Sequence, residues 1–185
     1  MKLISVNAAT LQNVSYRGRT VTTGIFKEPL QNRVMVRTLG LDGDKQADLT
    51  VHGGPGKAVY VYPSEHYPIW QAEFPGMPLP YGMFGENFTT EGLDESSVHI
   101  GDQFRIGGAV VEVTQPRMPC YKLGIRFGRP EMVKRFHASG RCGFYLAVLH
   151  EGEVGAGDVW ERIAQNDQQV SVVESYRRYF QEQGS

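Results

Sequence analysis

The sequence predicts a mainly β protein with a few helices, and three observations support that prediction. Short runs of β-branched and aromatic residues recur at close spacing, which is typical of a barrel or a sandwich. The 185 residues include 22 Gly and 10 Pro, so turns are frequent along the chain. We find no internal repeat and no low-complexity segment. A chain of this length forms one main domain with a sizeable buried core.

The expected strands are bounded by turn residues. They cover residues 2–6, 20–26, 33–39, 58–62, 98–100, 103–106, 109–114, 144–149 and 158–163. Gly107-Gly108 lies between two of these segments and suits a two-residue hairpin turn, because glycine tolerates positive φ.

Helices are expected over 64–74, 130–137 and 170–180. Pro68 lies inside the first of them and weakens the prediction for its first half. The last segment carries apolar residues at helical spacing behind Asn166 or Asp167 as a cap, so it is expected to dock on the body or on a partner. The Pro- and Gly-rich stretch 74–85 is expected to be a long loop.

Charge and composition exclude several classes of protein. Lys plus Arg total 19 and Asp plus Glu total 20, so the net charge is -1. A general nucleic-acid binder is usually basic, so stable nucleic-acid binding is not expected and any anion site must be a local cluster. No segment approaches the roughly 18 apolar residues that span a bilayer, and the N-terminus is too short for a signal peptide. We therefore expect a cytoplasmic protein without a membrane segment.

The most informative motif is the nonapeptide 115–123, Gln-Pro-Arg-Met-Pro-Cys-Tyr-Lys-Leu, which follows the expected strand 109–114. Its two prolines stiffen the backbone and remove two donors. The nearby cations of Arg117 and Lys122 would lower the pKa of the Cys120 thiol. A thiolate is a nucleophile and a soft metal ligand. The alternative, a buried structural cysteine beside two solvated charges, stays open on this motif alone.

A second candidate region, 40–58, is rich in Gly, Asp and Lys. Its glycines allow backbone N–H groups to converge on an anion, and Lys57 would add charge. His52 is a candidate ligand or hydrogen-bond donor, although a lone histidine is more often structural. The Walker pattern is absent because Ala58 follows the lysine, and the spacing of an EF-hand is not met.

Three further residues are weaker candidates. Asn87 lies between aromatic residues and is either a pocket carboxamide or a turn residue. Lys27 ends an expected strand, where a solvated lysine is the simpler interpretation. Arg141 lies in a glycine-flanked turn, and its neighbour Cys142 is expected to be a buried hydrophobe. No Cys-x-x-Cys zinc motif, serine-hydrolase elbow or His-Glu-x-x-His motif is present. A nucleophile pair of Cys120 and His52 is possible in principle.

Taken in order, these pieces resemble the MOSC-domain family, in particular its YiiM-like branch, over about residues 20–150. The matching motifs are G-I-F-K-E-P, G-L-D-G-D-K-Q-A-D, H-G-G-P-G-K-A, Y-P-S-E-H-Y, G-E-N-F-T-T-E-G-L, I-G-D-Q-F-R-I-G and Q-P-R-M-P-C-Y-K-L.

The resemblance implies a MOSC-type β-barrel over residues 1–164 with a short C-terminal helical tail over 165–185. It also implies a molybdenum cofactor of the pyranopterin type, with Cys120 as the catalytic residue and protein ligand to molybdenum; pyridoxal phosphate is not expected. Further residues at or beside motif positions are expected to bind the cofactor: Lys27, His52, Lys57, Asn87, Arg117 and Arg141. Relatives reduce small N-hydroxylated substrates such as hydroxylamino bases (6-hydroxylaminopurine detoxification), with electrons from a separate donor protein.

Two alternatives to a reductase stay open. The chain could carry the cofactor, or a sulfur on Cys120, without turnover, or it could be an interaction domain that has lost the cofactor. YiiM-like proteins usually continue into a three-helix lobe, whereas this sequence has one expected helix after residue 164. We therefore expect Tyr176, Tyr179 and Phe180 to be exposed, which would favour a homodimer.

Overall fold

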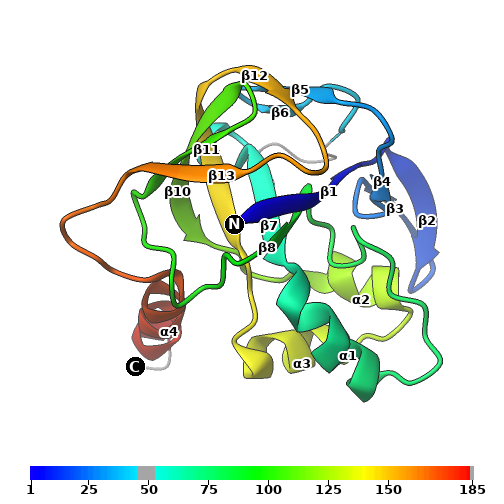
Figure 1. Cartoon of the computed structure of the whole chain (residues 1–185). Coiled ribbons are helices and arrows are strands. Elements are labelled where there is room, and N and C mark those ends of the chain that lie inside the picture. The colour runs from blue at the N-terminus through cyan, green and yellow to red at the C-terminus, as the bar shows by residue number, and fades with distance from the viewer. Residues whose placement is uncertain (46–52, 184–185) are drawn as a thin grey trace.

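The computed structural model describes residues 1–45 and 53–183 and is mainly β, as expected (Figure 1). Its largest sheet has eight strands in the order β13-β9-β10-β11-β7-β8-β1-β4. Paired neighbours are antiparallel, except that β7 and β8 are parallel. The strands are β13 (Trp160–Ala164), β9 (Gln103–Ile106), β10 (Ala109–Pro116), β11 (Phe144–His150), β7 (Val59–Pro63), β8 (Phe88–Glu91), β1 (Lys2–Ala8) and β4 (Glu28–Pro29).

Two small sheets and four α-helices complete the fold of the described residues. One sheet pairs β12 (Gly152–Val154), β5 (Val34–Arg37) and β6 (Gly40–Leu41), and the other is the hairpin of β2 (Gln12–Tyr16) and β3 (Arg19–Thr23). The helices are α1 (Tyr67–Glu73), α2 (Tyr121–Phe127), α3 (Met132–Ser139) and α4 (Val172–Gln183), with short 3₁₀ turns η1 (Pro55–Lys57) and η2 (Ser64–His66). Figure 1 shows α1, α2 and α3 gathered at one end of the sheets.

The expected closed barrel is not confirmed, because the large sheet is open across the described ranges, with β13 and β4 at its ends. The segment before β13 nevertheless lies along β1. Leu3 donates its backbone N–H to Asp158 at 2.9 Å, and Gly157 donates to Leu3 at 2.7 Å. Only an isolated bridge, Lys2 with Val159, forms there, because the chain turns at Gly157, whose φ is 96°. A regular ladder between β1 and β13 therefore does not develop.

The β9–β10 hairpin confirms the predicted glycine turn, since Ile106 pairs with Ala109 across it. The expected strand 98–100 is wrong. This segment is a turn with one isolated bridge, from His99 to Ser171, because the buried Asp102 carboxylate accepts the backbone N–H of His99 at 3.0 Å. The expected strand 20–26 ends early, at Thr23, whose hydroxyl accepts the N–H of Ile25 at 3.2 Å.

The expected helices are present with shifted bounds. Pro68 is the second residue of α1, where its missing N–H costs no helical hydrogen bond. The C-terminal helix is capped by Ser171, not by the expected Asn166 or Asp167. Ser171 and Glu174 exchange hydrogen bonds at 3.0–3.2 Å in a capping box.

The C-terminal helix docks on the body of the protein. Tyr176 is buried and its hydroxyl lies 2.8 Å from His137 Nδ1, so the expected exposure of Tyr176 is wrong. Tyr179 is exposed, as expected. No helix in the described part of the chain is long and apolar enough to cross a bilayer.

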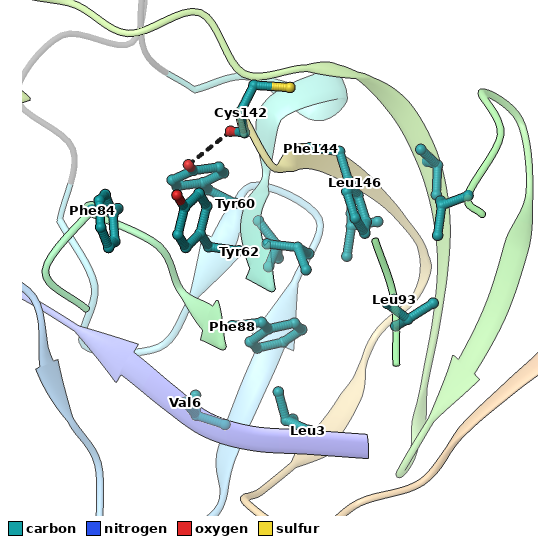
Figure 2. Close-up of a cluster of buried hydrophobic side chains, with 14 of the residues drawn as sticks. Leu3, Val6, Tyr60, Tyr62, Phe84, Phe88, Leu93, Cys142, Phe144 and Leu146 are labelled. Atoms are coloured by element: carbon teal, nitrogen blue, oxygen red, sulfur yellow. Dashed lines mark hydrogen bonds between the residues drawn. The ribbon is translucent and has the colours of Figure 1, made fainter. Parts of the chain in front are cut away.

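Large aromatic side chains join the helices to the sheet. Figure 2 shows part of this core, in which residues of β1, β7, β8 and β11 pack together. Tyr62 stacks on Phe84 with ring centroids 4.4 Å apart and accepts a hydrogen bond from the Trp70 indole at 2.7 Å. Trp70 in turn stacks on Phe136 of α3. Because these rings are fully buried, they fix α1 and α3 against β7, beside the end of β10.

Candidate functional site

A cleft opens where β10 ends and α2 begins. Its wall also includes residues of the segment after β3, of β7 and of β11. The polar side chains that line it include Lys27, Lys45, Lys57, Asn87, Arg117, Cys120 and Lys122. Among the described residues, this lining contains five basic side chains and no carboxylate. A chain of net charge -1 thus concentrates positive charge at one place.

Cys120 is held at the cleft by the backbone on both sides of it. Pro116 is the last residue of β10, and the N–H of Arg117 bonds to the carbonyl of Gly143 at 3.2 Å. The Cys120 backbone is extended and is the N-cap of α2, and its carbonyl accepts the N–H of Leu123 at 3.0 Å. The sequence predicted a rigid loop here but not α2 itself.

The two cysteines have different environments. Neither cysteine is in a disulfide, and Cys120 lies at intermediate exposure on the cleft wall. Cys142 is fully buried, and burial raises the pKa of its thiol well above the usual range. A buried neutral thiol behaves as a small hydrophobe, as predicted for Cys142. Only Cys120 of the two lines the cleft.

Arg117 is a buried cation on the same wall. Its guanidinium carbon lies 5.0 Å from the centroid of the Tyr60 ring and 5.1 Å from that of Phe136. Desolvation opposes its charge, but the nearby Tyr60, Tyr145 and Cys120 raise the pKa of Arg117 overall. Its Nη1 atom is buried without a hydrogen-bond partner among the described residues. Such an orphaned donor is costly unless a ligand accepts its hydrogen bond.

The neighbouring phenols are neutral parts of the wall. The hydroxyl of Tyr60 donates to the carbonyl of Cys142 at 2.9 Å. Burial raises the pKa of Tyr60 and of Tyr145, against the opposing effect of Arg117. Neither phenol therefore carries a negative charge near pH 7, and the charge of Arg117 stays available to an anion.

Lys27 and Asn87 meet at a carboxylate that the sequence did not single out as a site residue. The Lys27 ammonium lies 2.6 Å and 2.7 Å from the two carboxylate oxygens of Asp44. Asn87 Nδ2 donates to the same carboxylate at 2.9 Å. The available sequence signal is the Asp-Gly-Asp-Lys run within the Gly-, Asp- and Lys-rich region 40–58, which does not show that Asp44 pairs with Lys27. The partner at position 27 lies 17 residues away, so sequence reasoning missed the pair.

The remaining predicted site residues lie in different places. Lys57 reaches the cleft from η1. Arg141 is not among the described residues that line the cleft; its guanidinium carbon lies 5.9 Å from the Trp70 ring centroid. His52 lies outside the described residues, so its role stays a prediction, as does that of Arg141.

The β2–β3 hairpin contacts the start of α2 through one aromatic stack. Tyr16 and Tyr121 have ring centroids 5.8 Å apart with an interplanar angle of 27°. We expect Tyr121→Ala to speed tryptic cleavage after the exposed Arg17 and Arg19 several-fold, because the hairpin loses this contact. Limited proteolysis with mass spectrometry measures the rate. Equal cleavage rates in the variant and in a Tyr179→Ala control would show that the Tyr16–Tyr121 stack does not hold the hairpin in place.

The donor set fits an anionic cofactor that carries a soft metal. A thiol on a stiff loop offers a soft ligand. The surrounding lysines and the orphaned Arg117 donor offer charge-assisted hydrogen bonds to phosphate and to polar ring atoms.

Comparison with known proteins identifies the family of this chain. The family model described as the MOSC domain matches residues 48–161. YflK of Bacillus subtilis is 47% identical over 170 residues, which cover 92% of this chain and 76% of that protein. YiiM of Escherichia coli is 42% identical over 136 residues, which cover 72% of this chain and 61% of YiiM. A protein of Gibberella moniliformis named reductase is 37% identical, over 84% of this chain but only 28% of its own length.

Solved structures show the same fold. The crystal structure of YiiM from Geobacillus stearothermophilus superposes with a TM-score of 0.81 at 32% identity, covering 100% of this chain and 86% of that one. YiiM from Escherichia coli superposes with a TM-score of 0.74 at 31% identity, covering 95% of this chain and 76% of that one.

Proposed function

This chain belongs to the MOSC-domain family and is YiiM-like, and from that premise we propose that it is a molybdenum-cofactor-dependent oxidoreductase that reduces N-hydroxylated compounds. The observation that carries the proposal is the cleft that joins the Cys120 thiol to the buried guanidinium of Arg117, whose Nη1 has no hydrogen-bond partner among the described residues. A relative named reductase supports the redox class.

Each group in the cleft has a separate task in this proposal. The Cys120 thiolate is the protein ligand to molybdenum, on a loop that two prolines stiffen, so binding needs little reorganisation. Arg117, Lys27 and Lys57 bind the anionic pterin and its phosphate. When bound, the cofactor supplies the two-electron chemistry that cleaves an N–O bond. The reduction consumes two electrons and two protons and releases an amine and water.

The protein also controls the electrostatics around the bound group. The aromatic wall of Tyr60 and Phe136 keeps water from the Arg117 guanidinium, which strengthens its attraction for an anion. The cleft lining provides no carboxylate from the described residues to repel a phosphate. The electrons come from a separate donor protein in this proposal.

The test is turnover by protein that was expressed in a host that makes the cofactor. We expect about one molybdenum per chain and conversion of a hydroxylaminopurine to the aminopurine when dithionite-reduced methyl viologen supplies electrons. Elemental mass spectrometry and chromatography measure the two quantities. Metal-loaded protein without turnover would refute the reductase and favour a carrier, whereas protein without metal would refute the cofactor assignment.

A further inference from the structure

We infer that Asp44 is a positioning residue of this site, because its carboxylate fixes the Lys27 ammonium and the Asn87 carboxamide at the cleft wall. The inference rests on the proposed function, since it concerns how the cleft holds an anionic group. Asp44 itself is not among the residues that line the cleft, so it acts through its partners.

The Asp44 carboxylate is a buried hub. Its side chain is 1% exposed, and its two oxygens accept hydrogen bonds from three different groups. One oxygen accepts the Lys27 ammonium at 2.6 Å and the backbone N–H of Ala9 at 2.9 Å. The other accepts Lys27 at 2.7 Å and Asn87 Nδ2 at 2.9 Å. These contacts join the residue after β1, the segment after β3 and the residue before β8 at one point.

Both the oxygen and the nitrogen of the Asn87 carboxamide form hydrogen bonds within the protein. Its Oδ1 accepts the N–H of Tyr60 at 3.1 Å, which assigns the orientation of the amide. Its Nδ2 donates to Asp44 and, at 3.3 Å, to the carbonyl of Asn7. An amide nitrogen has two hydrogens, so both are engaged. The effect of Asn87 on a bound group therefore passes through Asp44 and through the backbone of β7.

Lys27 is fixed at its backbone as well as at its ammonium. Its carbonyl accepts Arg126 Nη2 at 3.5 Å. A Cβ at Gly82, where φ is +87°, would lie 2.7 Å from that carbonyl oxygen, so only glycine allows the close approach. An ammonium has three donors, and a carboxylate that it contacts through both oxygens engages two. The third donor of Lys27 then has no acceptor among the described residues, and in this inference it serves a group bound in the cleft.

The ion pair with Asp44 determines how Lys27 can interact with an anion bound in the cleft. Burial lowers the pKa of Lys27, and Asp44 opposes this effect, so the carboxylate helps to keep the ammonium charged. Yet the pair carries no net charge. In this inference Lys27 therefore contributes one oriented hydrogen bond to the bound group. Arg117 and the other lysines of the lining supply the positive potential.

An Asp44→Asn variant distinguishes the two explanations, because a purely electrostatic effect and a positioning effect predict opposite changes in cofactor retention. If only the local potential mattered, Asp44→Asn would remove a negative charge and tighten the hold on an anionic cofactor. If Asp44 positions Lys27, the same change weakens it. The matched control is Asp42→Asn, which deletes an equal charge from an exposed side chain that pairs with Arg37 on the surface.

Cofactor retention is the first readout. We expect Asp44→Asn to speed loss of pterin from the holoprotein about tenfold, measured by fluorescence of the oxidised pterin after timed dialysis. Asp42→Asn should stay within about twofold of wild type, since exposed ion pairs contribute little. Equal or slower loss from Asp44→Asn would overturn the inference.

The second readout does not need the cofactor. NMR of the labelled Lys27 side chain, assigned by its absence in Lys27→Arg, should show that Asp44→Asn lowers the pKa of Lys27 by about one unit or more. If wild-type protein holds no pterin, the proposed function fails while this titration still decides the inference. If Asp44→Asn does not fold, Asp44→Glu replaces it. That variant should keep the pKa of Lys27 but still lose pterin faster, and wild-type retention in it would overturn the inference.

Discussion

Replacing Cys120 with alanine is expected to abolish molybdenum binding while leaving the free energy of unfolding within about 1 kcal/mol of wild type. The thiol is the soft ligand of the cleft, and alanine offers no atom that binds a metal. The cost in stability is small because Cys120 is only partly buried and its side chain makes no capping hydrogen bond to α2. Elemental mass spectrometry and urea denaturation of cofactor-free protein measure the two quantities.

Cys142→Ala is the matched control, because it removes the other cysteine of the chain. Its sulfur is fully buried in the core, so deletion should cost about 1 kcal/mol, while molybdenum stays near the wild-type level. The two variants are thus expected to have similar stabilities, each within about 1 kcal/mol of wild type, and to differ in their molybdenum content. Metal retained in Cys120→Ala, or lost equally from both folded variants, would contradict the assignment of Cys120 as the ligand.

Local sequence signals predicted the elements that depend on local interactions. The β9–β10 hairpin followed from the Gly107-Gly108 pair, and α4 from its apolar spacing. Strand β8 was not predicted because it is only four residues long. It also pairs in parallel with β7, and a parallel pair has no connecting turn motif that the sequence would reveal. Helix α2 was missed because prolines precede it and Gly124 lies within it. The open sheet depends on the contact between β1 and the segment before β13 stopping at an isolated Lys2–Val159 bridge, which is a tertiary effect.

The candidate site likewise combines residues that local sequence signals identify and contacts that form only in the folded chain. Cys120, Arg117 and Lys57 were identified from the types and spacing of nearby residues, and all three line one cleft. The role of Asp44 could not be predicted, because its partners come from separate parts of the chain and meet only after folding. The burial of Arg117 between two rings also lay beyond the sequence, which predicted only a nearby charge.

Arg117→Met is expected to lose the cofactor without losing stability. In cofactor-free protein the guanidinium is a buried cation without a carboxylate partner in the described structure, and its orphaned Nη1 costs about 1–3 kcal/mol. Two contacts with ring faces offset part of this cost, at about 0.5–2 kcal/mol each. Methionine fills much of the same space and suits contact with Tyr60 and Phe136. The free energy of unfolding should therefore be equal to or higher than that of wild type.

Arg117→Ala separates the loss of charge from the loss of volume. It leaves a cavity between the two rings and should cost about 2–4 kcal/mol, with the same loss of cofactor. Urea denaturation of cofactor-free protein gives the stabilities, and pterin content after dialysis gives retention. If Arg117 were only a packing residue, Arg117→Met would retain the cofactor. If it were needed mainly for the fold, Arg117→Met would be destabilised as much as Arg117→Ala. A more stable variant that binds no cofactor would instead show that the protein keeps a destabilising buried charge for its ligand.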